Sequence, residues 1–185
     1  MNYRTDTDFH YEFLELLARR LRPRLYVELG VAAAKCIERV APHCQRAIGV
    51  DRKMPNPIQG YEFFHGTTVE FFRAFAAQAP LVELAFIDAD HGHAASLLDF
   101  ELLLPNVAND GLVLLHDTYP ENASWLTDDH CSDSFRTADA IYHRAFEYGV
   151  EIVTLPVPPG LTIVRKRQGQ IAWLPGESGA RLPPP

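Results

Sequence analysis

Residues 86–118 read FIDADHGHAASLLDFELLLPNVANDGLVLLHDT, and this stretch decides the fold. Predicted strands at 81–87 and 111–117 flank a helical stretch at 94–104. Strand, helix and strand in this order are typical of two parallel strands joined by a right-handed crossover. The strand at 111–117 is almost wholly apolar, which indicates burial on both of its faces.

The same alternation continues on both sides of this unit. The remaining predicted strands are at 24–30, 47–51, 61–65, 150–155 and 161–165, and the remaining predicted helices are at 9–21, 32–40, 69–79 and 135–148. The pattern predicts an α/β fold with a doubly wound, mostly parallel, Rossmann-like sheet of seven strands, an antiparallel C-terminal hairpin and helices on both faces. We expect a single domain over 1–166, with an N-terminal helix region at 1–23 and a Pro/Gly-rich tail at 167–185.

Composition excludes several kinds of partner. The chain has 185 residues, with 17 Lys and Arg against 24 Asp and Glu, and its net charge of −7 argues against binding to nucleic acid. No apolar run reaches membrane-spanning length, and the acidic first twenty residues are not typical of a signal peptide. Three cysteines, an odd number without metal-binding spacing, favour reduced thiols and a cytoplasmic location.

Two acidic side chains at strand ends indicate an adenosine-containing ligand. Asp51 ends the second predicted strand, where a carboxylate can accept hydrogen bonds from both ribose hydroxyls. The first strand ends in Glu28 and a single Gly30, so the GxGxxG pattern of dinucleotide sites is missing. An acid there would repel a pyrophosphate but attract an ammonium or sulfonium group, which favours S-adenosylmethionine. The alternative is that both acids merely cap the helices that follow.

A second group of side chains follows two neighbouring strands: Asp88, Asp90, His91 and His93 after one, and His116 and Asp117 after the other. The carboxyl ends of adjacent parallel strands lie close together, so these groups can share one cation. Mixed oxygen and nitrogen ligands are compatible with Mg²⁺, Mn²⁺ or a later transition metal. In the alternative interpretation, the second aspartate caps the next helix and the histidines face solvent.

The motifs Val27–Val31 and Ile48–Asp51, together with the stretch 86–118, resemble class I S-adenosylmethionine-dependent methyltransferases. The resemblance is to their small metal-dependent O-methyltransferases, of the catechol and caffeoyl-coenzyme A type and of antibiotic-pathway sugar methylation. It extends from about Leu25 to Arg165.

The resemblance implies a set of site residues. Cofactor binding is expected at Glu28, Gly30, Val31, Asp51, Thr68 and Asp88. A divalent metal, with Mg²⁺ expected first, would bind Asp88, His116 and Asp117, although the family has a carboxylate where His116 stands. Asp88 and His91 would be catalytic, with His91 as the base that takes the proton of the acceptor hydroxyl. His93 should point along the next helix and matter far less.

The expected acceptor is the hydroxyl of a small molecule. Specificity for it is expected from the N-terminal helix, from the segment 119–133 and from a homodimer partner. The segment 119–133 would cover the acceptor or would be a disordered surface loop. Two rival functions remain open at this point. One is a metal-dependent hydrolase or hydroxylase-like enzyme on the same sheet, and the other is a non-catalytic relative that only binds the cofactor.

Overall fold

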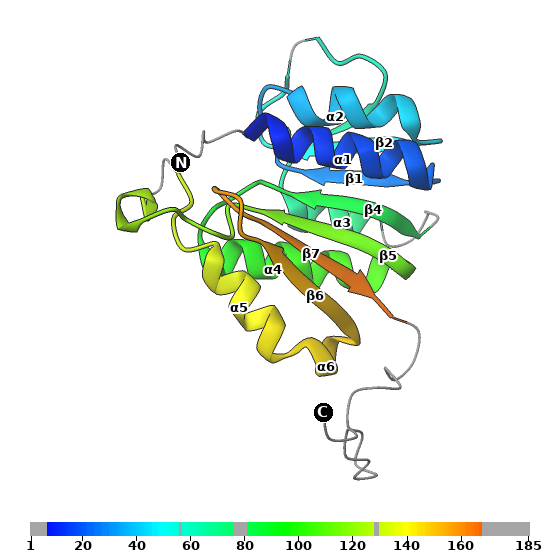
Figure 1. The fold of residues 1–185 in the computed structure, drawn as a ribbon. Coiled ribbons are helices and arrows are strands. Elements are labelled where there is room, and N and C mark those ends of the chain that lie inside the picture. The colour runs from blue at the N-terminus through cyan, green and yellow to red at the C-terminus, as the bar shows by residue number, and fades with distance from the viewer. Residues whose placement is uncertain (1–6, 56, 76–80, 128–129, 168–185) are drawn as a thin grey trace, which may run out of the picture.

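The computed structural model describes residues 7–55, 57–75, 81–127 and 130–167. Seven strands form one sheet in the order β3-β2-β1-β4-β5-β7-β6 (Figure 1). The strands are β1 (Tyr26–Leu29), β2 (Ala47–Asp51), β3 (Glu62–His65), β4 (Val82–Ile87), β5 (Val107–His116), β6 (Val150–Leu155) and β7 (Leu161–Lys166). The α-helices are α1 (Thr7–Leu21), α2 (Lys35–Val40), α3 (Thr68–Phe75), α4 (His93–Leu103), α5 (Phe135–His143) and α6 (Ala145–Tyr148). Short 3₁₀ turns lie at Ala41–His43, Leu104–Asn106 and Ala123–Trp125.

Strand pairing confirms the predicted fold class. β1 pairs in parallel with β2 and β4, β2 with β3, and β4 with β5. β7 pairs antiparallel with both β5 and β6, so the C-terminal hairpin closes one side of the sheet. The strand order reverses between β1 and β4, and in such sheets this reversal marks the ligand-binding crevice.

Helices cover both faces of the sheet, as predicted (Figure 1). Successive strand residues point to opposite faces, so Leu84 and Phe86 pack with α1 and α2 while Ala85 and Ile87 pack with α3, α4 and α5. The central strands are therefore buried on both sides. Their carboxyl ends, where the predicted site residues lie, stay open between the two helical layers.

Some element boundaries differ from the prediction for local reasons. The helix predicted from residue 32 begins at Lys35, because Ala32 and Ala34 adopt left-handed backbone angles, with φ of 44° and 61°. The last predicted helix divides into α5 and α6 at Arg144, whose φ of −108° and ψ of 15° are not helical. The predicted helical residues 76–79 and most of the tail, residues 168–185, lie outside the described residues.

No helix in the described parts of the chain is long and apolar enough to cross a membrane. All three cysteines lie in those parts, and all three are free thiols, as the sequence predicts.

Candidate active site

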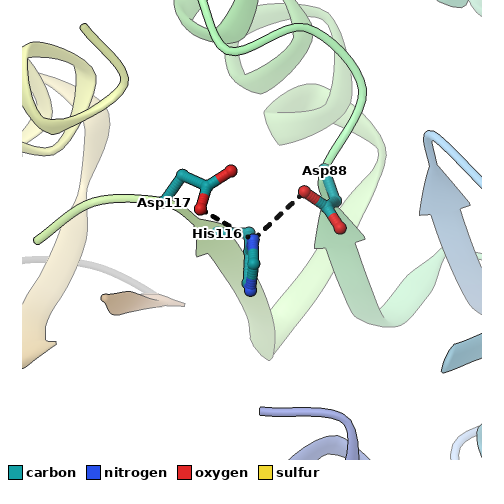
Figure 2. A group of neighbouring side chains, drawn as sticks. All are labelled: Asp88, His116 and Asp117. Carbon is teal, nitrogen blue, oxygen red and sulfur yellow. Dashed lines mark ion pairs between the residues drawn. The ribbon is translucent and has the colours of Figure 1, made fainter. Parts of the chain in front are cut away.

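The ends of β4 and β5 bring together three potential metal ligands, Asp88, His116 and Asp117, which we call the metal group. One ligand atom each from Asp88, His116 and Asp117 lie within 4.8 Å of one another. Figure 2 shows both carboxylates beside the ring of His116, whose Nδ1 is 3.2 Å from an oxygen of each. This grouping follows from the register, because Ile87 pairs with Leu115, so that Asp88 comes directly after the end of β4 beside His116 at the end of β5.

The chemistry of this group fits a divalent cation. His116 is buried, and neither of its ring nitrogens has a hydrogen-bond partner, although Nδ1 faces two carboxylates. Buried polar atoms without partners are rare in folded proteins, and an ion is one of the few things that explain them. Two carboxylates and one imidazole form a donor set that Mg²⁺, Mn²⁺ and later transition metals all accept.

Charges within the group shift the acidity of its members. Burial works against protonation of His116, but attraction to Asp88 and Asp117 outweighs it and raises the pKa of the imidazole to about 10. Asp88 has its pKa lowered, because the two nearby histidines overcome the effect of its burial. Protons and a divalent cation would therefore compete for the same lone pairs.

His91 lies beside these ligands, as the sequence predicts. Its Nε2 is 3.2 Å from Asp117 Oδ2 and 3.7 Å from Asp88 Oδ1, and its side chain is 29% exposed. Its Nδ1 contacts the carbonyl oxygen of His130. A carbonyl oxygen only accepts, so Nδ1 carries the hydrogen and Nε2 is left as the proton acceptor when the ring is neutral. Interaction with Asp88 and Asp117, against the effect of burial, raises the pKa of His91 to about 9, so the ring becomes a proton acceptor at neutral pH when a cation offsets the charge of these carboxylates.

The segment after β5 is attached to this group by several contacts. The thiol of Cys131 lies 3.7 Å from Asp117 Oδ1. Ser134 donates to the carbonyl oxygen of His91 over 2.8 Å, and Asp133 accepts from the backbone N–H of His93. His93 itself points to Thr137 on α5, with 3.1 Å between Nδ1 and the hydroxyl, and is not part of the metal group. The described part of 119–133 thus covers the ends of β4 and β5.

Helix α1 supplies two aromatic neighbours that our sequence analysis missed. His10 is fully buried with its ring centroid 4.9 Å from that of His116, and Tyr11 stacks on the same imidazole at 6.3 Å. Burial lowers the pKa of His10 to about 4. One signal was present, because the spacing of His10, Leu14 and Ala18 places the histidine on the buried face of the helix.

A separate cleft of about 200 Å³ lies at the ends of β1, β2 and β4. Three of the predicted cofactor residues, Gly30, Asp51 and Thr68, line it together with Ala89, Asp90 and Asp99. Asp51 Oδ2 accepts hydrogen bonds of 2.9 Å from the backbone N–H groups of Val31 and Ala32. The carboxylate therefore also holds the loop after β1, and these bonds help to lower its pKa against the effect of burial.

Gly30 is required where β1 meets β4. Its φ is +86°, and a Cβ atom there would lie 2.2 Å from the carbonyl oxygen of Asp88. Only glycine combines this backbone angle with so close an approach. This approach brings the cleft and the metal group next to each other. Asp88 belongs to the metal group, and the next residue, Ala89, lines the cleft.

Glu28 lies behind the cleft. Its side chain is 1% exposed, accepts a 2.6 Å hydrogen bond from the Tyr26 hydroxyl, and is not among the residues that line the cleft. Burial raises its pKa to about 8, so the carboxyl is mostly protonated at neutral pH. The structure thus places Gly30 and Asp51 at the cleft, with Glu28 supporting them from within the sheet.

Comparisons with known proteins indicate the family and the fold. Residues 27–118 match the model of a protein family described as a methyltransferase domain. No match was found among curated proteins.

Solved structures with similar folds include several methyltransferases. An O-methyltransferase from Bacillus cereus, in complex with S-adenosylhomocysteine, has a TM-score of 0.70 at 13% identity, over 90% of this chain and 84% of that one. TomG, an O-methyltransferase of tomaymycin synthesis from Streptomyces achromogenes, has a TM-score of 0.70 at 14% identity, over 86% and 80%. MycE, a methyltransferase of the mycinamycin pathway in complex with Mg and S-adenosylhomocysteine, has a TM-score of 0.63 at 15% identity. The match covers 95% of this chain and 55% of that one.

At these low identities the solved structures show only that the fold is shared. The family match covers the strands at whose ends the cleft and the metal group lie. Residues 27–118 therefore match a methyltransferase domain, and the chain has the fold of the methyltransferases named above.

Proposed function

We propose that the protein transfers a methyl group from S-adenosylmethionine to a hydroxyl of a small molecule, with His91 as general base and a divalent cation at Asp88, His116 and Asp117. The observation that carries this proposal is the orientation of His91. Its Nδ1 is engaged by the His130 carbonyl, and its Nε2 faces the carboxylates that would hold the cation.

The acceptor has a place beside this histidine. A hollow of about 450 Å³ is lined by His91, Gly92 and Ser132, and it shares Ala89 and Asp90 with the cofactor cleft. A molecule bound there would lie between the cofactor and the base. Pre-positioning of two reactants in this way supplies a large part of the rate of methyl transfer.

On the cofactor side, Asp51 would accept hydrogen bonds from the ribose hydroxyls, since each oxygen of a carboxylate can accept more than one. Thr68 lines the same cleft, and the adenine is expected beside it. Gly30 lets the chain pass close to the cofactor, and Val31, buried beside it, belongs to the same predicted set. Glu28 would act at the methionine end from behind this loop.

At the metal group, Asp88, His116 and Asp117 would hold a divalent cation, with Mg²⁺ the first expectation. When bound, such a cation lowers the pKa of a coordinated hydroxyl. MycE, one of the similar structures, holds Mg.

His91 Nε2 takes the proton of the acceptor hydroxyl, and the His130 carbonyl stabilises the imidazolium through Nδ1–H. The hydroxyl oxygen forms a bond to the methyl carbon as the carbon–sulfur bond breaks, and the sulfonium leaves as a neutral thioether. Cys131 and Ser134 keep the covering segment against the site, which limits the access of water.

The test compares His91→Ala with His93→Ala in a transfer assay with radiolabelled S-adenosylmethionine and a panel of catechols, phenols and glycosides. Removal of a general base lowers turnover by about 10²–10⁴-fold, and we expect this loss for His91→Ala with unchanged affinity for S-adenosylhomocysteine. His93→Ala is the matched control, because its ring points to α5, and its turnover should stay near that of the wild type.

Two results would contradict the proposal. One is transfer by His91→Ala at the wild-type rate on an acceptor that the wild type methylates. The other is failure of the wild type to bind S-adenosylhomocysteine in calorimetry, which would favour a metal-dependent hydrolase on the same sheet.

A further inference from the structure

Asp99 is a buried carboxyl that the proposed reaction does not use. It lies on α4, is 7% exposed, and lines the cofactor cleft together with Thr68 and Ala95. Its position on the helix is set by packing, since Ser96, Phe100 and Leu103 are buried on the same side. A charged residue on a buried helical face is uncommon unless it has a partner.

The described residues offer Asp99 no cationic partner. Its carboxyl interacts with the side chain of Thr68, and the charge that acts on it is that of another acid, Asp90. Burial raises the pKa of Asp99 to about 6, which reflects how little water reaches it. Buried polar groups are costly unless they are hydrogen-bonded, and the cleft is where a further donor can come from.

The arrangement of the cleft indicates which donor that is. Asp51 lies at the end of β2, where the proposed function places the ribose, and Asp99 and Thr68 lie on α4 and α3. The base would extend from the ribose toward these two helices. Adenine carries one exocyclic donor, its 6-amino group, and an ionised carboxylate can only accept.

We propose that Asp99 accepts a hydrogen bond from the 6-amino group of the adenine and so determines the base specificity of the cleft. This proposal rests on the proposed function, because it takes the ligand to be S-adenosylmethionine or its product. It adds a residue from α4 to the cofactor residues predicted from the strand ends.

A purely structural role for Asp99 makes a different prediction. Thr68 is the first residue of α3, so contact with Asp99 ties the two helices together. Loss of such a tie would weaken every ligand of the cleft by the same factor. A role in reading the base would change only the ratio between ligands that differ at position 6.

The test is calorimetry with S-adenosylhomocysteine and S-inosylhomocysteine, in which a 6-oxo group replaces the 6-amino group. Hydrogen bonds to charged groups contribute about 1.5–3 kcal/mol, or about 10–160-fold in affinity. We therefore expect the wild type to prefer the adenosyl ligand by at least about tenfold. In Asp99→Asn the preference should fall to threefold or less, because an amide can present either its oxygen or its NH₂ group.

Asp90→Asn is the matched control. Asp90 lines the same cleft, but it is exposed and its Oδ1 accepts from the Gly92 N–H over 2.9 Å. This variant should keep the wild-type preference. The substitution Asp99→Asn is isosteric, and the fold of the variant can be checked by circular dichroism. The ratio of the wild-type affinities for the two ligands provides a further test that needs no variant.

The proposal is overturned if the wild type binds both ligands with equal affinity. It is also overturned if Asp99→Asn keeps the wild-type preference, even where the affinities for both ligands fall by the same factor. Complete absence of S-adenosylhomocysteine binding to the wild type would contradict the proposed function as well. The two failures are therefore distinguishable.

Discussion

At the residue scale, the metal group shows how two strand ends combine into one site. Asp117 has a left-handed backbone, with φ of 59°, which turns its carboxylate back toward the ring of His116. Such angles are unfavourable for most residues, although aspartate tolerates them better than most. The strain is stored at a predicted ligand, as is common at functional sites.

We expect Asp117→Gly to weaken binding of Mg²⁺ and Mn²⁺ at least tenfold, because it removes one of two carboxylates without adding backbone strain. The measurement is calorimetry with Mg²⁺ and electron paramagnetic resonance with Mn²⁺. Asp110→Gly is the matched control, since Asp110 has a φ of 63° but pairs with Arg165 at 2.8 Å on an exposed surface. Equal cation affinity in Asp117→Gly and wild type would show that Asp117 is not a ligand.

The residues of this group could be predicted because parallel strands end at one edge. Asp88, His116 and Asp117 each follow an apolar run, so sequence alone brings them together. Cys131 and Asp99 could not be found in that way. Cys131 approaches through a segment without periodicity, and an acid within a helix is more often solvated, although the buried spacing of Phe100 and Leu103 was a usable signal.

At the element scale, the loop between β1 and α2 combines function with backbone strain. Two of its alanines, Ala32 and Ala34, have positive φ, and the loop is held by hydrogen bonds from Val31 and Ala32 to Asp51. The sequence predicted a helix over residues 32–40, and alanine is in general the best helix former. Tertiary contacts with Asp51 outweigh that propensity.

Ala32→Gly should therefore stabilise the protein. Ala32 is exposed and has a φ of 44°, so glycine relieves strain without loss of buried surface. Strain relief of about 1–2 kcal/mol, less an unfolded-state entropy cost of about 0.4–1 kcal/mol, predicts a net gain of about 0.5–1 kcal/mol in the free energy of unfolding, measured by urea denaturation.

Ala33→Gly is the control for this change. Ala33 is also exposed, but its φ is not positive, so glycine there adds only flexibility and should destabilise the protein. Equal destabilisation by both substitutions would show that the backbone at Ala32 is not strained.

At the scale of the whole molecule, the site is assembled from segments far apart in the sequence. α1 brings His10 and Tyr11 onto His116 from one face of the sheet, and the segment after β5 brings Cys131 onto Asp117. The sheet order and the two helical layers could be predicted from alternating strands and helices. The docking of α1 on the metal group could not, because it depends on contacts between residues about a hundred positions apart.

The buried carboxyl of Glu28 makes the free energy of unfolding depend on pH. Its unfolded pKa is 4.5 and its folded pKa about 8, so between these values the folded protein holds a proton that the unfolded chain releases. Stability conferred at this position is therefore complete below pH 4.5 and decreases as the pH rises toward 8. The slope is at most about 1.4 kcal/mol per pH unit.

Glu28→Gln should remove this dependence. Glutamine has the same shape and its carbonyl oxygen can accept the Tyr26 hydroxyl, but it cannot ionise. The difference in the free energy of unfolding, variant minus wild type, should rise from pH 4.5 to 8 and level off above, measured by urea denaturation in EDTA. Glu121→Gln, at an exposed position, controls for removal of a glutamate charge. A difference for Glu28→Gln that stays flat across this range would mean that the Glu28 carboxyl is ionised in the folded protein, and that a charge lies beneath the cofactor cleft where we place a neutral hydrogen bond.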